Sequence, residues 1–380
     1  MSLVYSMGRG VADRVRSEEF LDGRFTIRSN RGVRPAERLL VERLDKADRG
    51  DVLDLGSREG LLAAAVRSLY PEARVSAWGW DVHEYDAARA VHEANQVAGV
   101  AWQLAPVPWE GDVERFDRVL LPLPGDQELD FARELVHHAH RLLKVGGLLL
   151  VSVESKRAGA LDGYVRKCFA SLSSEEGSHQ GRVWLARRKA ADRPPGAPGF
   201  APYTVREGDL ILSFVSRPGV FAHGRLDEGA RALLKVLEVR PDDDAILDLG
   251  CGAGELGIVA AVRAPGATVV LADSSTRAIQ CAERNAEGNV PGRWKAVLTA
   301  DPGRDVEGSF SLALLNPPYY ANQRISEVFL DAALRRLRPG GRMVLVTKLV
   351  DWHREAIRAS FRLDEEVASL GYAVFFATRS

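Results

Sequence analysis

The sequence predicts an α/β protein made of two tandem, doubly wound domains, each built on a parallel sheet. In the second half of the chain, short apolar segments alternate with amphipathic ones, which indicates strands followed by helices. A second observation is an internal repeat at an offset of 194 residues (248 minus 54). This offset recurs at three separated places: Asp54 with Asp248, Phe116 with Phe310, and Gly146–Gly147 with Gly340–Gly341. A constant offset indicates two copies of one domain with equal element lengths.

A segment rich in proline and glycine separates the two copies. Residues 191–203 contain four prolines and two glycines, a composition that we expect to exclude both a helix and a sheet ladder. We therefore predict a first domain at residues 1–190, a linker at residues 191–204 and a second domain at residues 205–380. In a chain of 380 residues, each domain is long enough to bury its own core.

The second domain has a clear order of elements. Strands are predicted at Leu210–Val215, Ala245–Leu249, Thr268–Ala272, Ala296–Thr299, Ser311–Leu315 and Arg342–Val346. Helices are predicted at Asp227–Leu237, Glu255–Arg263, Thr276–Glu287 and Glu327–Leu337. The segment Gly371–Thr378 is predicted to form a last edge strand.

The composition is typical of a soluble globular protein, with 46% hydrophobic and 27% charged residues. We expect neither a membrane span nor a signal peptide, because no apolar run is long enough and the first residues lack a basic segment before an apolar core. The three cysteines lack metal-binding spacing, so we expect a cytoplasmic protein without a metal. A net charge of -1 argues against gripping long bare nucleic acid by charge alone.

The segment Ile246–Gly254 is predicted to be a buried strand that enters a glycine turn and then a helix. Glycines at such a turn let backbone N–H groups face a ligand without a Cβ in the way. The turn alone is weak evidence, since several nucleotide-binding folds share this geometry. Cys251 within the turn is expected to pack in the core rather than to act as a nucleophile.

Acidic residues follow the next two strands, at the sheet edge where open α/β folds bind ligands. Asp273 is placed to accept hydrogen bonds from ribose hydroxyls, and the alternative is that Asp273 or Ser274 caps the following helix. Asp301 is placed to accept from an adenine amino group, with a simple turn aspartate before Pro302 as the alternative.

The motif Asn316-Pro317-Pro318-Tyr319 follows a buried strand. The Asn316 side-chain oxygen and a backbone carbonyl near Pro317 offer two acceptors for the N–H groups of a planar amino group. Holding both groups favours a pyramidal nitrogen with an available lone pair, and the prolines preset the turn. Tyr319 offers a π-face for stacking an extruded base. The alternative is a strand-ending turn without chemistry.

The glycine turn, this motif and the lead-in Pro218–Gly229 together resemble class I S-adenosylmethionine-dependent methyltransferases, and more narrowly the RsmC/RlmG family of ribosomal RNA guanine-N2 methyltransferases. The resemblance covers the whole chain and implies two Rossmann-like methyltransferase domains, of which the first is degenerate. It implies methyl transfer from S-adenosylmethionine to the exocyclic N2 of a guanine, with ribosomal RNA or the ribosomal subunit as partner. Tyr319 departs from the Phe that family members often have, and Tyr320-Ala321-Asn322 replaces their usual His.

The motifs and the resemblance predict two sets of site residues. The catalytic set is Asn316, Pro317, Pro318 and Tyr319, and the cofactor-binding set is Asp248, Gly250, Cys251, Gly252, Gly254, Asp273, Ser274, Asp301 and Asn316. In the first copy, Arg58 stands at the position of Gly252 and Pro122 at that of Asn316. We therefore expect the first copy to lack activity and to serve RNA recognition or structural support.

Other interpretations stay open at this point. The motif also fits an N-methyltransferase acting on adenine N6 or on a protein glutamine amide, and a non-catalytic RNA-binding scaffold is a further alternative. Two basic segments are candidate RNA contacts: Arg182–Lys189, and the set Arg24, Arg28, Arg31 and Arg34. For Arg182–Lys189 the alternative is a closing strand of the first domain with a solvated end. Three neighbouring histidines are expected on a solvated helix face rather than at a metal: His137, His138 and His140.

Overall fold

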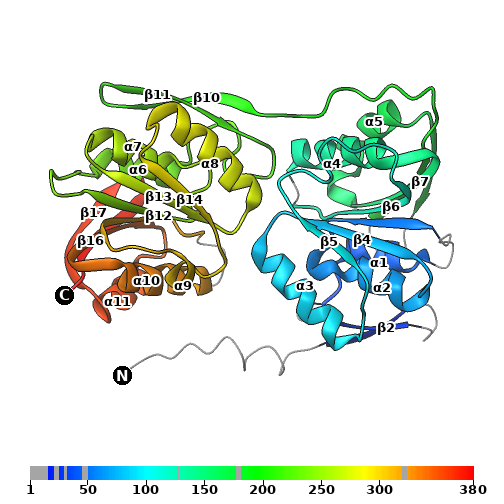
Figure 1. The fold of residues 1–380 in the computed structure, drawn as a ribbon, viewed down its shortest axis with the longest axis horizontal. Helices are drawn as coiled ribbons and strands as arrows, with labels where there is room; N and C mark the ends of the chain where they lie inside the picture. The colour runs from blue at the N-terminus through cyan, green and yellow to red at the C-terminus, as the bar shows by residue number, and fades with distance from the viewer. Residues whose placement is uncertain are drawn as a thin grey trace. The chain divides into compact units, whose positions relative to one another are not determined.

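The computed structural model describes residues 16–20, 25–29, 32–44, 50–126, 128–176, 181–318 and 323–380. The chain divides into two compact units, Met1–Pro198 (unit 1) and Gly199–Ser380 (unit 2). The division falls inside the segment predicted as a linker. Each unit holds a seven-stranded sheet with helices packed on its faces (Figure 1), so the predicted α/β class with two doubly wound domains is confirmed.

Unit 1 contains, in chain order, β1 (Arg16–Phe20), β2 (Phe25–Ser29), α1 (Pro35–Val41), β3 (Asp51–Leu55), the 3₁₀ helix η3 (Arg58–Gly60), α2 (Leu61–Leu69), β4 (Arg74–Gly79), α3 (Val82–Ala94), β5 (Ala101–Leu104), β6 (Phe116–Leu123), α4 (Leu129–Leu142), β7 (Leu143–Glu154), α5 (Ser155–Cys168), β8 (Ser171–Glu176) and β9 (Gly181–Arg187). The strand order in its large sheet is β5-β4-β3-β6-β7-β9-β8. Strands β1 and β2 form a separate antiparallel hairpin.

Unit 2 contains β10 (Ala201–Glu207), β11 (Leu210–Ser216), α6 (Glu228–Val236), β12 (Ala245–Leu249), α7 (Glu255–Arg263), β13 (Thr268–Asp273), α8 (Thr276–Asn289), β14 (Trp294–Leu298), α9 (Pro302–Asp305), β15 (Phe310–Leu315), α10 (Arg324–Arg336), β16 (Leu337–Thr347), α11 (Val350–Arg358), β17 (Arg362–Ser369) and β18 (Tyr372–Thr378). Its large sheet has the order β14-β13-β12-β15-β16-β18-β17, the same arrangement as in unit 1. Matching elements keep the predicted offset, as α2 and α7 do. The internal repeat is thereby confirmed in three dimensions.

The sheet of unit 2 separates two apolar layers because successive side chains of a strand point to opposite faces. Ile246 of β12 and Leu312 of β15 pack in the layer under α6, α7 and the β10–β11 hairpin. Their neighbours Leu247 and Ala313 pack in the opposite layer, which α10 and α11 cover. In Figure 1, α6, α7 and α8 lie on one side of the sheet, and α9, α10 and α11 lie on the other. Both faces are covered, so the loops at the strand ends remain as the place for a site.

The carboxyl-terminal strands differ from the prediction. Strand β18 pairs antiparallel with both β16 and β17, so it is an inner strand and the predicted edge position is wrong. The edge is β17, which carries charged residues such as Glu365 and Glu366 and therefore lacks an apolar strand pattern. Charged side chains on an exposed edge are a common protection against pairing with other chains.

The segment predicted to exclude a sheet ladder contains the start of one. Strand β10 begins at Ala201 and pairs with β11 in a two-stranded hairpin, in which Pro202 lies opposite Val215. The prediction is therefore wrong for the last residues of the segment. Proline is tolerated because each strand of a two-stranded hairpin has one unpaired edge, where a missing N–H costs no ladder bond.

The histidines of α4 do not lie on a solvated face. His138 and His140 are 8% and 6% exposed, and the pKa of each imidazole is lowered, mainly by burial. The His140 ring contacts Phe169 edge to face at 5.0 Å, and His137 Nδ1 lies 3.0 Å from the Pro195 carbonyl. The prediction of solvation is wrong because the end of α5 and the chain after β9 cover this side of α4.

Among the described residues, no helix is long and apolar enough to cross a membrane.

Candidate active site

The predicted motifs of unit 2 meet at the carboxyl edge of its sheet. Leu249, the last residue of β12, pairs with Ala272 of β13 on one side and with Leu315 of β15 on the other. The residues at or just after these strand ends are Gly250, Asp273 and Asn316. Because the three strands are parallel neighbours, the glycine turn, the acid and the Asn-Pro-Pro motif lie side by side.

The three glycines of the turn all adopt positive φ angles, at +68° for Gly250, +55° for Gly252 and +90° for Gly254. An ideal Cβ at Gly250 would lie 2.6 Å from the Phe329 ring, and one at Gly254 would lie 2.9 Å from Ile258 Cδ1. A Cβ at Gly252 would meet no atom within 4 Å. A side chain at Gly250 or Gly254 would therefore displace Phe329 or Ile258 as well as strain φ, whereas the described residues leave the space beside Gly252 open.

Asp248 supports the turn from inside the protein. Its side chain is 1% exposed, and its Oδ2 accepts a hydrogen bond from the Gly257 N–H at 2.8 Å. In unit 1 the equivalent Asp54 accepts from the Ala63 N–H at 2.9 Å. The acid thus fixes the following helix to its strand in both copies, and contact of Asp248 with a cofactor stays a prediction.

Two carboxyl groups next to the turn have pKa values raised by burial. Burial raises the pKa of Asp248 to about 7, and the negative charges of Glu255 and Asp273 add to the rise. Burial also raises the pKa of Glu255 to about 7, although a hydrogen bond from the Tyr203 hydroxyl at 2.5 Å opposes the rise. The neutral carboxyl forms are therefore more populated here than in solvated carboxyl groups, and a positive charge nearby would oppose this.

Asp273 links the glycine turn to the start of α8. Its Oδ2 accepts from the Gly252 N–H at 3.0 Å, and its Oδ1 accepts from the Ser275 N–H at 2.8 Å. The N-cap of α8 is Ser275, whose hydroxyl accepts from the Ala278 N–H. The alternative that Asp273 or Ser274 caps this helix is therefore wrong, and ribose binding by Asp273 stays a prediction, as does the role of Ser274.

Two other predicted cofactor residues have structural partners. Asp301 caps the short helix α9 by accepting from the Arg304 N–H at 3.1 Å, and its own N–H donates to Thr299 Oγ1 at 2.9 Å. This is the turn role weighed as an alternative, and an adenine contact stays a prediction. Cys251 is 5% exposed, and burial raises the pKa of its thiol well above the ordinary range, which fits a packing role.

The Asn316 carboxamide is held by a carboxylate from another part of unit 2. Its Nδ2 donates to Asp227 Oδ2 at 2.9 Å, and Asp227 is the N-cap of α6. Pro317 is buried and Pro318 is half-buried. Tyr319, predicted to stack on the base, lies outside the described residues.

Several residues of this edge carry no signal in the sequence. Asp227 lies 89 residues before its partner Asn316. Phe329 covers Gly250 from α10, and Lys348 Nζ lies 4.6 Å from the centre of the Tyr372 ring. Their places follow from tertiary contacts, although the acid before an amphipathic helix does predict a cap at Asp227.

In unit 1, aromatic side chains pack around the equivalent turn. Trp80 stands at the position of Ser274, and an ideal Cβ at Gly56 would lie 3.1 Å from the Trp80 ring. That ring packs against Trp78 and Phe131 at 5.1 and 4.8 Å. Strand β6 continues to Leu123, beyond the position at which β15 ends. The described residues of unit 1 therefore continue a strand where unit 2 has its Asn-Pro-Pro turn.

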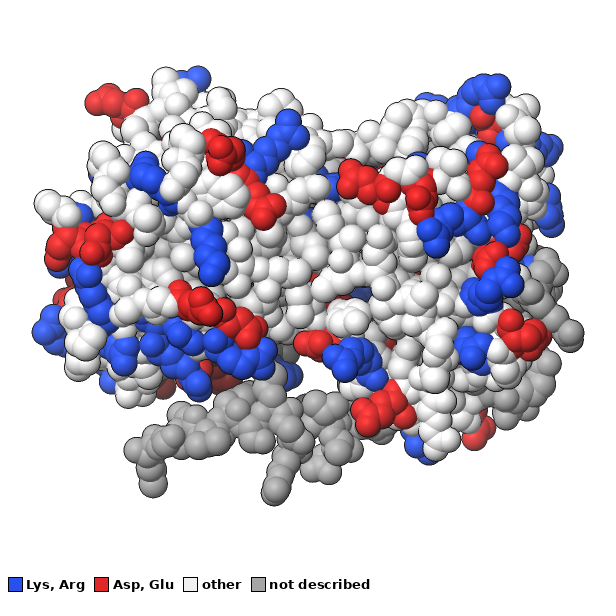
Figure 2. All heavy atoms as spheres, in the orientation of Figure 1, with Lys and Arg blue, Asp and Glu red and all other residues white. Residues whose placement is uncertain are grey.

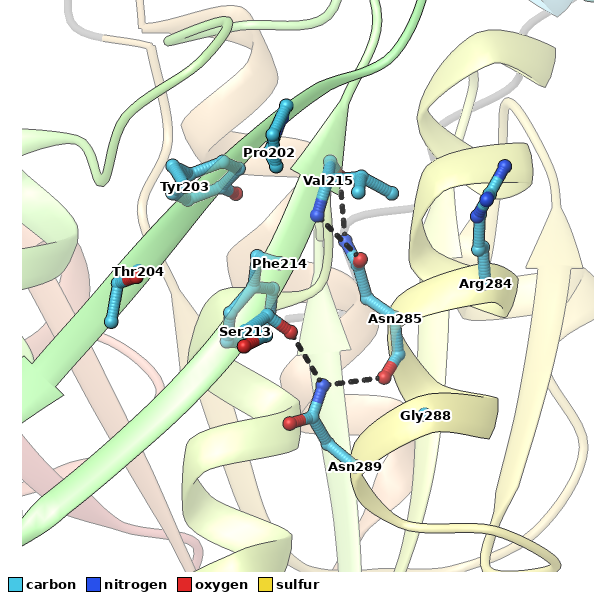
Figure 3. A pocket seen from close by; sticks show the side chains of 10 residues that line it. All are labelled: Pro202, Tyr203, Thr204, Ser213, Phe214, Val215, Arg284, Asn285, Gly288 and Asn289. Carbon is cyan, nitrogen blue, oxygen red and sulfur yellow. Dashed lines mark hydrogen bonds between the residues drawn. The ribbon is translucent and has the colours of Figure 1, made fainter.

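A groove of about 370 Å³ lies elsewhere in unit 2, between the β10–β11 hairpin and α8 (Figure 3). The Asn285 amide bonds to both the N–H and the carbonyl of Val215 at 2.8 Å, and the Asn289 amide donates to the Ser213 carbonyl at 3.0 Å. Because these amides tie the helix to the hairpin, we interpret the groove as a packing seam and not as the site.

The two basic segments predicted as RNA contacts differ in structure. In Arg182–Lys189, strand β9 lies between β7 and β8, Trp184 is buried, and Arg188 pairs with Glu114 at 3.0 Å. Most of the segment is therefore a sheet strand, as in the alternative, and RNA contact by its exposed end stays a prediction. In the second set, the Arg28 guanidinium donates to the Ala94 carbonyl, and Arg24 and Arg31 lie outside the described residues.

Unit 2 carries a basic patch that we name the α9–α10 arginines. It consists of Arg304, Arg335 and Arg336, which lie together because Arg336 donates to the carbonyls of Gly303 and Arg304. Basic side chains gather over these helices in Figure 2. The side chains of Arg304 and Arg335 are 71% and 52% exposed, although each also pairs with a neighbouring aspartate.

Comparison with known proteins agrees with this geometry. The model of the methyltransferase small domain family matches residues 23–173 and 211–375. Ribosomal RNA small subunit methyltransferase C of Ectopseudomonas mendocina (strain ymp) is 32% identical over 302 residues, which cover 76% of this chain and 83% of that protein. The protein of the same name from Pseudomonas putida (strain W619) is 29% identical over 316 residues, covering 80% and 90%.

A solved structure has the same fold along nearly the whole chain. It is the 16S ribosomal RNA N2 methyltransferase RsmC of T. thermophilus in complex with AdoMet and guanosine, with a TM-score of 0.77 and 22% identity. The match covers 97% of this chain and 98% of that one. The chain therefore belongs to the methyltransferase small domain family and, within it, to the family of ribosomal RNA small subunit methyltransferase C.

Proposed function

We propose that unit 2 transfers a methyl group from S-adenosylmethionine to the exocyclic N2 amino group of a guanine in ribosomal RNA. The observation that carries this proposal is the Asn316 carboxamide, which Asp227 holds at the carboxyl edge of the sheet beside the glycine turn. The relatives support the same assignment, since the curated ones are named for small-subunit ribosomal RNA and the solved one binds AdoMet and guanosine.

The glycine turn fits a cationic cofactor. S-adenosylmethionine supplies an electrophilic methyl group on a positively charged sulfur. The acids near the turn raise one another's pKa, as the charges of Glu255 and Asp273 do for Asp248, so a positive ligand relieves their repulsion. Gly252 borders open space that a side chain would fill. In this proposal the turn holds the cofactor, and Asp273 and Asp301 receive its ribose and adenine.

The Asn-Pro-Pro turn fits a planar amino group. The Asn316 nitrogen is engaged with Asp227, so its Oδ1 serves as the acceptor for one N–H of the target. A backbone carbonyl near Pro317 accepts the second N–H. Holding both hydrogens off the ring plane frees the nitrogen lone pair, which is otherwise delocalised into the base, and directs it toward the methyl group. A strong general base is not required, because the nitrogen becomes acidic only after it has gained the methyl group.

Unit 1 serves RNA recognition or structural support in this account, and the physiological partner is the small ribosomal subunit or its RNA. Arg58 in place of Gly252 and Pro122 in place of the asparagine favour a unit without catalysis. In unit 2 the α9–α10 arginines offer exposed cations for phosphate groups. The modest net charge of -1 fits a local patch better than a long basic groove.

Methyl transfer by the purified chain tests the proposal. The acceptors are small ribosomal subunits, protein-free small-subunit RNA and, as a control, large-subunit RNA, each with isotope-labelled S-adenosylmethionine. Digestion to nucleosides and mass spectrometry should place the label in N2-methylguanosine of small-subunit RNA. Label in N6-methyladenosine or in a protein glutamine would replace the proposed reaction with one of the alternatives. RNA binding without any label would favour the scaffold interpretation.

A further inference from the structure

The orientation of the Asn316 side chain depends on a single carboxylate. Among the described residues, the hydrogen bond recorded for its carboxamide is the one from Nδ2 to Asp227 Oδ2 at 2.9 Å. An ionised carboxylate only accepts hydrogen bonds, so the nitrogen of the amide must face it and the oxygen must face away. Without such a partner, the two ends of an amide are nearly interchangeable in shape. Asp227 therefore selects the orientation in which the Asn316 nitrogen is engaged and Oδ1 is left as the acceptor.

The carboxylate is itself fixed by the start of α6. The same Oδ2 accepts from the Ala230 N–H at 3.0 Å, which makes Asp227 the N-cap of the helix. Helix α6 packs in the apolar core of unit 2 through Ala230, Leu233 and Leu234. A carboxylate held by a core helix keeps its place better than one on a free loop. The position of α6 therefore fixes Asp227, and Asp227 fixes the Asn316 side chain.

Gly229 lies against both side chains, and a larger residue there would disturb their contact. Gly229 is helical with no positive φ, so backbone conformation does not require glycine there. An ideal Cβ at Gly229 would instead lie 2.9 Å from both Asn316 Oδ1 and Asp227 Oδ2. The absence of a side chain at this position leaves room for the carboxylate–carboxamide pair. The positions of Asp227, Gly229 and Asn316 are therefore coupled.

We propose that Asp227 is a positioning residue for methyl transfer: it fixes the Asn316 carboxamide so that Oδ1 accepts a hydrogen of the target amino group. The proposal rests on the proposed function for the identity of the target. The Asp227 side chain has two roles in this proposal: it caps α6, and it orients Asn316. The two roles can be tested separately.

The kinetic test uses the full chain and three variants. In Asp227→Ser the short hydroxyl still caps α6 but does not reach Asn316, so kcat should fall roughly tenfold or more while KM and cofactor affinity change little. Asp227→Asn keeps an oxygen acceptor for both N–H groups and should recover a large part of the rate. The matched control is Asp81→Ser, at the N-cap of α3, where the carboxylate accepts from His83 and Glu84 N–H groups. This control should leave kcat unchanged.

A double-mutant cycle distinguishes positioning from a merely structural role. If Asp227 acts through Asn316, then Asp227→Ser combined with Asn316→Ala should be no slower than Asn316→Ala alone. Independent effects that multiply would overturn the proposal. An unchanged kcat in Asp227→Ser, with an active wild type, would overturn it as well.

A measurement that needs no activity separates this proposal from the proposed function. In an NMR spectrum of the chain with ¹⁵N-labelled asparagine, the Asn316 side-chain amide is assigned by its absence in Asn316→Ala. Its resonances should shift strongly in Asp227→Ser and little in Asp227→Asn. Resonances that stay in place in Asp227→Ser would contradict the positioning role even if methyl transfer is found. A wild type that transfers no methyl group to RNA, with the expected shift, would instead refute the proposed function and leave the geometry intact.

Discussion

Replacing Gly229 with alanine is expected to slow catalysis while the protein stays folded. Gly229 is buried near the start of α6, and an added Cβ would lie 2.9 Å from both Asn316 Oδ1 and Asp227 Oδ2 and 3.4 Å from Tyr372 Cε1. Contacts below 3 Å force atoms to move, and the closest atoms here are the ends of two side chains. The displacement therefore falls on the groups that we place in the reaction, and not on the backbone.

The effect of Gly229→Ala on stability should be small, whereas its effect on the rate should be large. Alanine in a helix is favoured over glycine by about 1 kcal/mol, whereas loss of a hydrogen bond to a charged group costs roughly 1.5–3 kcal/mol. The net change in the free energy of unfolding is thus about 1–2 kcal/mol or less, and the melting temperature should fall by no more than about 4–8 °C. A displacement of the acceptor by about 1 Å costs on the order of 100-fold in rate. Since the shift here is smaller, we expect kcat to fall roughly tenfold or more.

The assay is kcat for methyl transfer to the best ribosomal RNA acceptor, together with the melting temperature of each variant. Gly288→Ala is the matched control, because Gly288 lies in α8 and an added Cβ would meet no atom within 4 Å. It should raise the melting temperature by about 2–4 °C without changing kcat. A Gly229→Ala variant with the kcat of the wild type would refute the reasoning that the carboxamide position limits the reaction.

Three further predictions concern the same site. Asn316→Ala removes one acceptor for the amino group and should slow methyl transfer roughly tenfold or more with cofactor affinity unchanged; a normal rate would show that the motif is not catalytic. Titration calorimetry should give one S-adenosylmethionine site per chain, lost in Gly252→Arg, whereas two sites or a surviving one would contradict the assignment to unit 2. Burial raises the pKa of Glu255 from 4.5 to about 7, so the folded state holds a proton that the unfolded chain loses, and stability should fall as the pH rises between these values. Glu255→Gln, which still accepts from Tyr203, should reduce that fall in denaturant titrations at several pH values, and an unchanged slope would refute the assignment.

Much of unit 2 was predictable because its central elements carry strong local patterns. Strand β12 and helix α7 have the bounds predicted from the sequence, Ala245–Leu249 and Glu255–Arg263. Here a run that is apolar apart from Asp248, three glycines and a following Pro265-Gly266 mark the boundaries. The repeat added independent support, since the same lengths occur in unit 1.

Two elements near the carboxyl terminus escaped prediction. Helix α11 spans nine residues, and its buried residues are a histidine, His353, and Ile357. His353 is instead held by polar contacts, with its Nδ1 near Leu349 O at 2.9 Å and its Nε2 near Ser326 Oγ at 3.1 Å. Edge strand β17 carries many charged residues because only part of it faces the core.

The site was predictable as a set of motifs but not as an arrangement. The strand ends and glycines follow from local sequence, and the parallel sheet then brings them together. The contact between Asp227 and Asn316 joins residues 89 positions apart, and a single sequence contains no signal for such a pair. The packing of Trp80 against the unit 1 turn likewise depends on a side-chain direction, and the obstruction of a cofactor by Arg58 stays a prediction.

The most direct test of the central claim is the N2-methylguanosine content of small-subunit ribosomal RNA in the organism that encodes this chain. Mass spectrometry of nucleosides would compare the parent strain, a strain that lacks the gene, and that strain complemented with the wild type or with Asn316→Ala. We predict that deletion removes one N2-methylguanosine, that the wild-type gene restores it, and that Asn316→Ala restores little. An unchanged content after deletion, or full restoration by Asn316→Ala, would contradict the account.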